Sequence, residues 1–174
     1  MKQIYLMIVL CLVIAQTSFA QDKLSALFSK LDGNDNVTQV TITKSMLDMM
    51  PKTGSSNNAL NMNGVDVKDI VNKLNQIDIF TSKDVDTKKM MIKETKEYFN
   101  GNGNGKDYII LMRVKDKKDD VVFYGKKDGN FFTSLIMVVN QEDDCTLIRI
   151  SGKFTPQDIQ DVTNASKTKQ EKTE

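Results

Sequence analysis

Residues 108–151 read YIILMRVKDKKDDVVFYGKKDGNFFTSLIMVVNQEDDCTLIRIS. The stretch consists of apolar runs rich in Val, Ile, Tyr and Phe, the residue types that favour strands, separated by short polar turns. An Asp-Gly pair at 128–129, between two such runs, is a strong hairpin signal. The pattern therefore predicts an antiparallel meander with strands over 108–115, 121–126, 131–140 and 145–151.

The chain before this meander mixes helical and extended patterns. Leu24, Leu27, Phe28 and Leu31 have the spacing of one face of a helix, which we expect over 22–31. Similar spacing or strand-forming composition predicts further elements: strands over 37–43 and 77–81, and helices over 45–50, 66–76 and 84–100. The Asn- and Ser-rich stretch 51–64 has no period and is expected to be a loop.

These elements together predict an α+β fold. Its core is a single, mostly antiparallel sheet of about five or six strands, with the C-terminal four-strand meander as its larger part and helices packed on one face. A last helix is expected to begin with Thr155 as N-cap and Pro156 at its first position. We expect one domain over 21–165 and a disordered tail over 166–174, which is rich in Lys, Glu, Thr and Gln.

The first twenty residues predict export. Lys2 precedes an apolar run over 4–15, and Ser18 and Ala20 fit the small-residue positions of a cleavage site before Gln21. The apolar run is shorter than the roughly twenty residues that a membrane-spanning helix needs. We therefore expect a signal peptide over 1–20, no transmembrane segment in the mature chain, and a periplasmic or secreted location.

Two cysteines lie in the chain, and cleavage would remove one of them. We do not expect lipid anchoring through Cys11, because Val9 and Leu10 precede it and the apolar run continues past it. The remaining Cys145 cannot form an intramolecular disulfide. It is interpreted as a small strand residue, with a reactive or dimer-forming thiol as the alternative.

The charge balance gives no sign of a nucleic-acid partner. The chain has 24 basic and 23 acidic residues, so the loss of Lys2 with the signal peptide leaves a neutral mature protein. Such a protein has no global basic field to attract nucleic acid.

The chain contains no histidine. This absence removes the commonest general base and every Ser-His or Cys-His triad. We predict no catalytic residue and no cofactor. The alternative is a small carboxylate-dependent hydrolase or cofactor-binding enzyme that uses Asp78, Asp84 or Asp86.

Two segments resemble metal sites without matching them. Residues 32–36 resemble the start of a calcium loop, but Val37 replaces the required glycine and Thr43 the required glutamate. Methionines over 46–50 and 90–91 could offer sulfur to copper(I), yet methionine at helical spacing is usually core filler. We predict no metal site.

The two arginines of the chain are the candidate binding residues. Arg113 and Arg149 both lie inside apolar strands, where a planar guanidinium suits a partly buried carboxylate. One interpretation is a cross-strand ion pair with an acid on the same sheet face. The other is contact with an anion or a partner peptide on the sheet.

Several short stretches lie in a similar order to those of a known family. They are VTITKSML at 40–47, KLNQI at 73–77 followed by IFTS at 79–82, LMRVK at 111–115 and ISG at 150–152. Over 37–154 the chain resembles the Bacteroidetes-type family of small exported proteins called domain of unknown function 4252. The resemblance implies a signal peptide or lipobox, no established activity and no active site to carry over.

The sequence thus favours a non-enzymatic periplasmic or secreted binding domain. We expect the exposed side of the meander, or the 51–64 loop, to contact an envelope protein or peptide. Besides the enzyme named above, a structural or stress-related cell-envelope factor is the other alternative. The oligomeric state stays open.

Overall fold

The structure is a computed structural model, and it describes residues 23–49, 61–62, 65–100 and 104–161. The predicted signal peptide, its cleavage site at Ala20 and Gln21, and the predicted tail over 166–174 lie outside the described residues. Most of the predicted 51–64 loop lies outside them too.

Helices and strands follow the predicted order. Their bounds are α2 Lys23–Leu31, β1 Thr38–Thr43, α3 Lys44–Met49, β2 Asn61–Met62, β3 Val65–Asp66, α4 Val67–Lys73, β4 Leu74–Ser82, α5 Val85–Asn100, the short 3-10 helix η1 Asn104–Asp107, β5 Tyr108–Lys115, β6 Asp120–Asp128, β7 Phe131–Asn140 and β8 Cys145–Phe154. A last helix spans 156–161. The short strands β2 and β3 pair with each other in antiparallel orientation, so residues 61–62 of the predicted loop belong to a strand.

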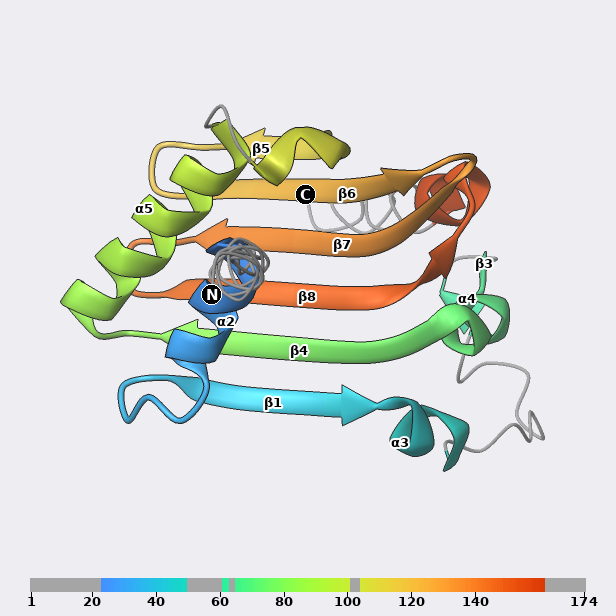
Figure 1. The fold of residues 1–174 in the computed structure, drawn as a ribbon, viewed down its shortest axis with the longest axis horizontal. Coiled ribbons are helices and arrows are strands. Elements are labelled where there is room, and N and C mark those ends of the chain that lie inside the picture. Colours follow the sequence, from blue (N-terminus) through green and yellow to red (C-terminus); the bar gives the residue numbers. More distant parts are fainter. Residues whose placement is uncertain (1–22, 50–60, 63–64, 101–103, 162–174) are drawn as a thin grey trace, which may run out of the picture.

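One antiparallel sheet of six strands, in the order β1-β4-β8-β7-β6-β5, forms the centre of the protein (Figure 1). Strands β5 to β8 are neighbours both in sequence and in the sheet, which confirms the predicted meander. Gly129, in the turn between β6 and β7, has φ 58°, a conformation that glycine adopts without steric cost. Beyond the meander, β8 pairs with β4 and β4 with β1, so the predicted α+β fold is confirmed.

The helix predicted over 66–76 ends early. Helix α4 stops at Lys73, and Leu74 already belongs to β4, where it pairs with Gly152 of β8. The ladder with β8 takes main-chain groups that another helical turn would have used. A Cβ atom added to Gly152 would collide with the main-chain oxygen of Lys73 and lie 2.6 Å from Phe154 Cζ. The missing side chain of Gly152 therefore lets the end of α4 pack directly on β8.

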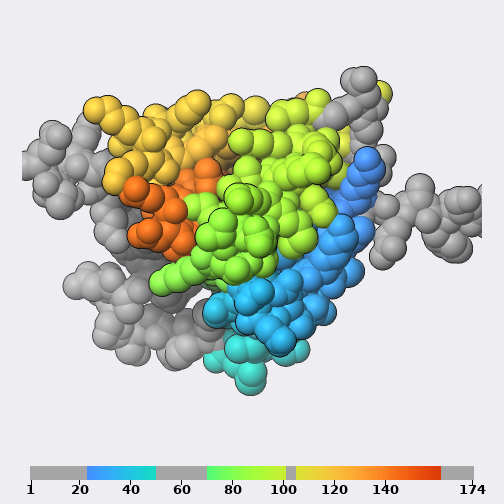
Figure 2. Space-filling model, turned by 90° about the vertical axis from the view of Figure 1, so that its left-hand side faces the viewer, coloured from blue at the N-terminus to red at the C-terminus, as the bar shows by residue number. Residues whose placement is uncertain are grey.

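Helices α2 and α5 cover one face of the sheet, the front face in Figure 1, which carries Phe80, Ile136 and Leu147. Figure 2 shows the two helices side by side, the green α5 next to the blue α2. The apolar stripe predicted in α2 is buried at all of its positions: Leu24, Leu27, Phe28 and Leu31. Met91 and Tyr98 of α5 complete the core on this face.

The opposite face, the back face, carries Ile77, Leu135 and Ile150. The predicted packing of helices on one face holds for α2 and α5. The short helices α3, α4 and 156–161 lie instead at one end of the sheet (Figure 1). Leu47 of α3 and Ile159 of the 156–161 helix belong to the back-face core. Strands β4, β7 and β8 carry apolar side chains on both faces, so the back face also needs cover.

Candidate functional site

Arg149 lies on the front face, beneath α2. Its Nε and Nη2 atoms donate hydrogen bonds to Oδ2 of Asp78, its direct register partner on β4. The other carboxylate oxygen, Oδ1, accepts hydrogen bonds from Thr41 at 3.0 Å and Gln76 at 2.7 Å. The guanidinium carbon lies 4.3 Å from the ring centroid of Phe28, so Arg149 also contributes a cation–π contact that holds α2.

Arg113 lies on the edge strand β5 and pairs with Asp120 of β6 in a two-bond geometry, at 3.2 Å from Nε and 2.9 Å from Nη2. The hydrogen bonds that Arg113 donates to Asp120 raise the pKa of Arg113. Both arginines therefore make the cross-strand ion pairs that were one of the two interpretations. The other interpretation, that they contact an anion or peptide, stays a prediction, and half-exposed Arg113 is the more accessible of the two.

Burial alone would raise the pKa of Asp78. Hydrogen bonds from Gln76, Arg149 and Thr41 more than offset that effect, so the pKa of Asp78 lies below its ordinary value. A carboxylate held in this way stays charged at neutral pH and is occupied on both oxygens. It is suited to fixing β1, β4 and β8 together rather than to moving protons.

The other carboxylates of the enzyme alternative have separate surroundings. Asp84 caps α5 by accepting hydrogen bonds from the backbone nitrogen and the hydroxyl of Thr87, which lower the pKa of Asp84. Asp86 lies in the first turn of α5 with an exposed side chain. A pocket lined by two carboxylates would favour the enzyme alternative. The groove described below is lined by one carboxylate, that of Asp158.

The calcium-like segment forms a tight turn between α2 and β1. Gly33 has φ 72°, and the side-chain oxygen of Asn34 accepts a hydrogen bond from the backbone nitrogen of Asn36 at 2.9 Å. Across the described ranges, no group of three or more acidic, cysteine or histidine residues is placed to hold a metal ion.

Cys145 is buried at the start of β8, on the front face. Burial raises the pKa of its thiol to about 11. At neutral pH the thiol is therefore protonated and enclosed, as the interpretation of a small strand residue requires.

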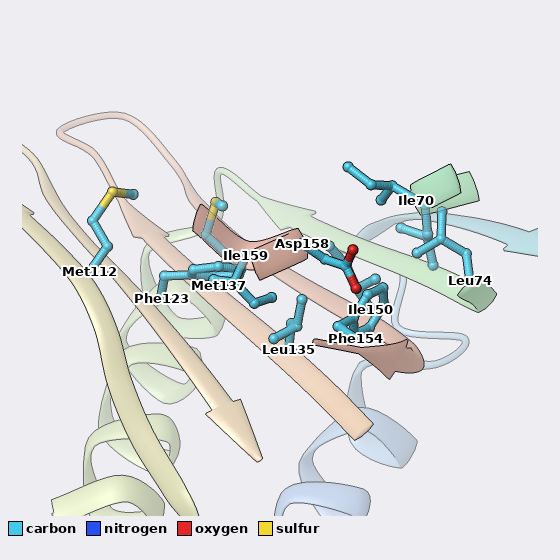
Figure 3. A pocket seen from close by; sticks show the side chains of 11 residues that line it. Ile70, Leu74, Met112, Phe123, Leu135, Met137, Ile150, Phe154, Asp158 and Ile159 are labelled. Carbon is cyan, nitrogen blue, oxygen red and sulfur yellow. The ribbon is translucent and has the colours of Figure 1, made fainter. Parts of the chain in front are cut away.

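The back face contains an apolar groove. Its volume is about 200 Å³, and its walls come from α4, the 156–161 helix and strands β4 to β8. Figure 3 shows Met112 and Ile70 at opposite ends of the lining, with the 156–161 helix lying over its middle. The groove is lined by Ile70, Leu74, Ile77, Met112, Phe123, Leu135, Met137, Ile150, Phe154, Asp158 and Ile159.

Strand register explains why the groove is apolar. One row of register partners crosses the back face on all six strands without a polar side chain: Val40, Ile79, Ile148, Met137, Phe123 and Met112. We call it the apolar row. Ile77, Ile150 and Leu135 form the next row along the strands. The second row lines the groove on β4, β8 and β7, and the apolar row lines it on β7, β6 and β5.

The polar contact of the groove is at its α4 end. Lys73 Nζ lies 2.7 Å from Oδ1 of Asp158, so the pair joins α4 to the 156–161 helix. The predicted N-cap is confirmed, because Thr155 Oγ1 accepts from the Asp158 nitrogen at 3.2 Å while Asp158 Oδ2 accepts from the Thr155 nitrogen at 2.7 Å. Burial raises the pKa of Asp158, but the bonds from Lys73 and Thr155 outweigh it and bring the pKa below its ordinary value.

Comparison with protein families gives one match. The family model described as domain of unknown function 4252 matches residues 28–162, a range that contains every element from β1 to β8. The chain belongs to this family. Neither a curated protein nor a solved structure matches the chain. In the part of this family member that the structure describes, no helix is long and apolar enough to cross a membrane.

Sequence reasoning missed the groove of this family member. The two arginines were conspicuous as charges inside apolar strands, whereas the groove residues looked like ordinary core. One signal was present: β4, β7 and β8 contain apolar residues at consecutive positions, as in LIMVV over 135–139. A strand with apolar side chains on both faces needs cover on both faces. The longest described helices cover only one face of the sheet.

Proposed function

We propose that this protein is an exported, non-enzymatic binding protein that takes an apolar group into the groove of its back face. The observation that carries the proposal is the groove itself: about 200 Å³, with apolar side chains at every lining position except Asp158. Concave apolar sites with few polar groups are the usual form of small-ligand pockets. Part of the groove's lining belongs to the meander, whose exposed side was, together with the 51–64 loop, the binding surface that the sequence predicted.

Two further features support binding. Met112 and Met137 line the groove, and flexible thioether side chains adapt to ligands of different shape. The apolar row extends past the groove to Val40, which is 46% exposed, and beside its other end Val114 is 49% exposed. An envelope protein or peptide that presents the apolar group would find further apolar surface there.

The proposal is tested with an uncharged apolar fluorophore, N-phenyl-1-naphthylamine. We expect saturable binding by the wild type and a loss of at least tenfold in affinity in Met137→Trp, whose larger side chain fills the middle of the groove. Ile77→Gln provides a second variant, which makes the wall polar without adding bulk.

Val85→Trp is the matched control, because Val85 is 61% exposed on α5 and lies outside the groove lining. It should bind the fluorophore like the wild type. Circular dichroism and thermal melting establish that each variant is folded. Equal binding by folded wild type, Met137→Trp and Ile77→Gln would refute the groove as the site.

Export is tested separately. Amino-terminal sequencing of the protein recovered from the periplasm or the medium should begin at Gln21. A mature chain that begins at Met1 would contradict the export proposal.

A further inference from the structure

The groove is long relative to its volume. It crosses five strands from β4 to β5, and four spacings of about 4.8 Å make roughly 19 Å. A volume of about 200 Å³ spread over that length is narrow, so an extended chain would lie in the groove with one side open to solvent, and an elongated probe such as N-phenyl-1-naphthylamine would fill part of its length. The shape therefore indicates a linear ligand that lies across the strands.

The length of the groove sets the number of carbons expected in the ligand's chain. Bonds of about 1.5 Å between tetrahedral carbons advance an extended chain by about 1.25 Å per carbon, so roughly 15 carbons span the groove. The lining from Met112 through Phe123, Met137 and Leu135 to Ile150 is apolar, and the Asp158 carboxylate lies beside Ile150 (Figure 3). This part of the groove matches a hydrocarbon tail.

The chain supplies little of its own to fill the groove. After the predicted signal peptide, the two longer stretches outside the described residues are MPKTGSSNNAL at 50–60 and VTNASKTKQEKTE at 162–174. Both are dominated by polar residues, and neither contains a run of apolar residues as long as the groove. The occupant is therefore a separate molecule.

The polar end of the groove favours a head group that accepts hydrogen bonds. Figure 3 places the Asp158 carboxylate toward the end that Ile70 and Leu74 form. Both Asp158 oxygens already accept bonds, from Lys73 and from the Thr155 nitrogen. The Lys73 side chain is 35% exposed, and an ammonium group carries three N–H donors, of which Asp158 accepts one.

We propose that the ligand of the groove is a long-chain carboxylate, with its head group at Lys73 and its tail extended toward Met112. This inference rests on the proposed function, since it names the ligand class of the same site. A carboxylate supplies acceptor oxygens for the N–H donors of Lys73 that Asp158 does not use, and the tail covers the apolar side chains between β4 and β5.

Displacement of N-phenyl-1-naphthylamine by saturated fatty acids of 8, 12, 16 and 20 carbons tests the tail. Each added methylene should raise affinity by up to about fourfold while it stays inside the groove. The gain should stop near 16 carbons, where the tail reaches the Met112 end. Affinity that does not depend on chain length would overturn the proposal.

Ligands of 16 carbons that differ only in the head group test Lys73. Palmitate should bind the wild type more tightly than hexadecanol or hexadecylamine. Lys73→Gln should weaken palmitate by about three- to tenfold, because one charge-assisted bond at a half-exposed site is lost. The affinity of Lys73→Gln for hexadecanol should stay within twofold of the wild-type value. Lys73→Arg should keep the wild-type affinity for palmitate.

Lys30→Gln is the matched control, because Lys30 also forms an ion pair, with Glu94 at 2.6 Å, but between α2 and α5 on the front face. This substitution should change the affinity for neither palmitate nor hexadecanol. If the fluorophore binds in the groove and palmitate does not displace it, the ligand class is wrong and the proposed function stands. If nothing binds in the groove, the proposed function fails. Equal weakening of palmitate and hexadecanol in Lys73→Gln would show that Lys73 holds the wall rather than the head group.

Discussion

Arg149 donates two hydrogen bonds to one carboxylate oxygen of Asp78, from Nε at 2.9 Å and from Nη2 at 2.7 Å. The two residues are 71 positions apart in the chain and face each other across β4 and β8. The Asp78 side chain is 4% exposed and that of Arg149 33%. The carboxylate is thus the deeply buried member, and its charge depends on the partners around it.

Arg149→Met should destabilise the protein by about 2–3 kcal/mol, because the buried Asp78 charge loses its cation. The double variant Asp78→Leu with Arg149→Met should lose less than Arg149→Met alone, since no unpaired charge remains. Urea denaturation measures both. Arg113→Met, at the exposed pair with Asp120, is the control and should cost much less than Arg149→Met. A double variant that is less stable than the single one would contradict this account.

The lowered pKa of Asp78 predicts that the stability of the folded protein decreases in acid. The folded pKa of Asp78 lies below its ordinary value of 3.8, so its contribution to stability is complete above about pH 3.8. It is lost as the pH falls from there through the lower folded pKa. Urea midpoints measured from pH 6 to pH 2 should therefore fall more gently in Asp78→Asn than in the wild type. Asp158→Asn should show the same change in slope, because the pKa of Asp158 is lowered too. Parallel curves for all three proteins would be inconsistent with these shifts.

Gly152→Ala should cost about 1–3 kcal/mol, because the new methyl group meets main-chain atoms that cannot turn aside. Its neighbour would be the carbonyl oxygen of Lys73, at the α4 end of the groove. Gly125→Ala is the comparison: its methyl group would meet Phe132 Cδ1 at 2.7 Å and Leu111 Cδ1 at 2.8 Å, both on side chains that can move. Thermal melting should therefore rank Gly152→Ala below Gly125→Ala. The reverse order would show that the contact between the end of α4 and β8 can move apart at little cost in stability.

Cys145 should resist thiol reagents in the folded protein. With a pKa of about 11, about one thiol in a thousand is ionised at pH 8, and the sulfur is enclosed. Site-resolved mass spectrometry after alkylation should find Cys145 unmodified under native conditions and fully modified in urea. Rapid native modification, or a disulfide-linked dimer through Cys145, would favour the reactive thiol of the alternative interpretation.

Local signals made the meander predictable. Alternating residues in β5 to β8 and the Asp-Gly turn at 128–129 act between neighbours in the chain, so the sequence contains what is needed to place them. The start of β4 was different. Leu74 has the spacing of a helix with Ile70 and Val71, and only its pairing with Gly152 places it in a strand.

The candidate site lay beyond the reach of local patterns. That Arg149 would need a carboxylate followed from its place in an apolar strand, but that the carboxylate is Asp78 depends on β4 lying beside β8. The groove depends on the same pairing and on the contact between Lys73 and Asp158, which are 85 residues apart. No periodicity in a single sequence specifies such contacts.

The place of β8 between β7 and β4 has a consequence for how the chain folds. The pairing of β8 with β7 closes a short turn, whereas its pairing with β4 must wait until a loop of about 70 residues closes, at a larger entropic cost. We expect the meander to form first and β1 and β4 to join it afterwards. During that interval the edge of β8 that later pairs with β4 is unpaired and apolar. When the protein refolds at high concentration, we expect chains to aggregate through this edge.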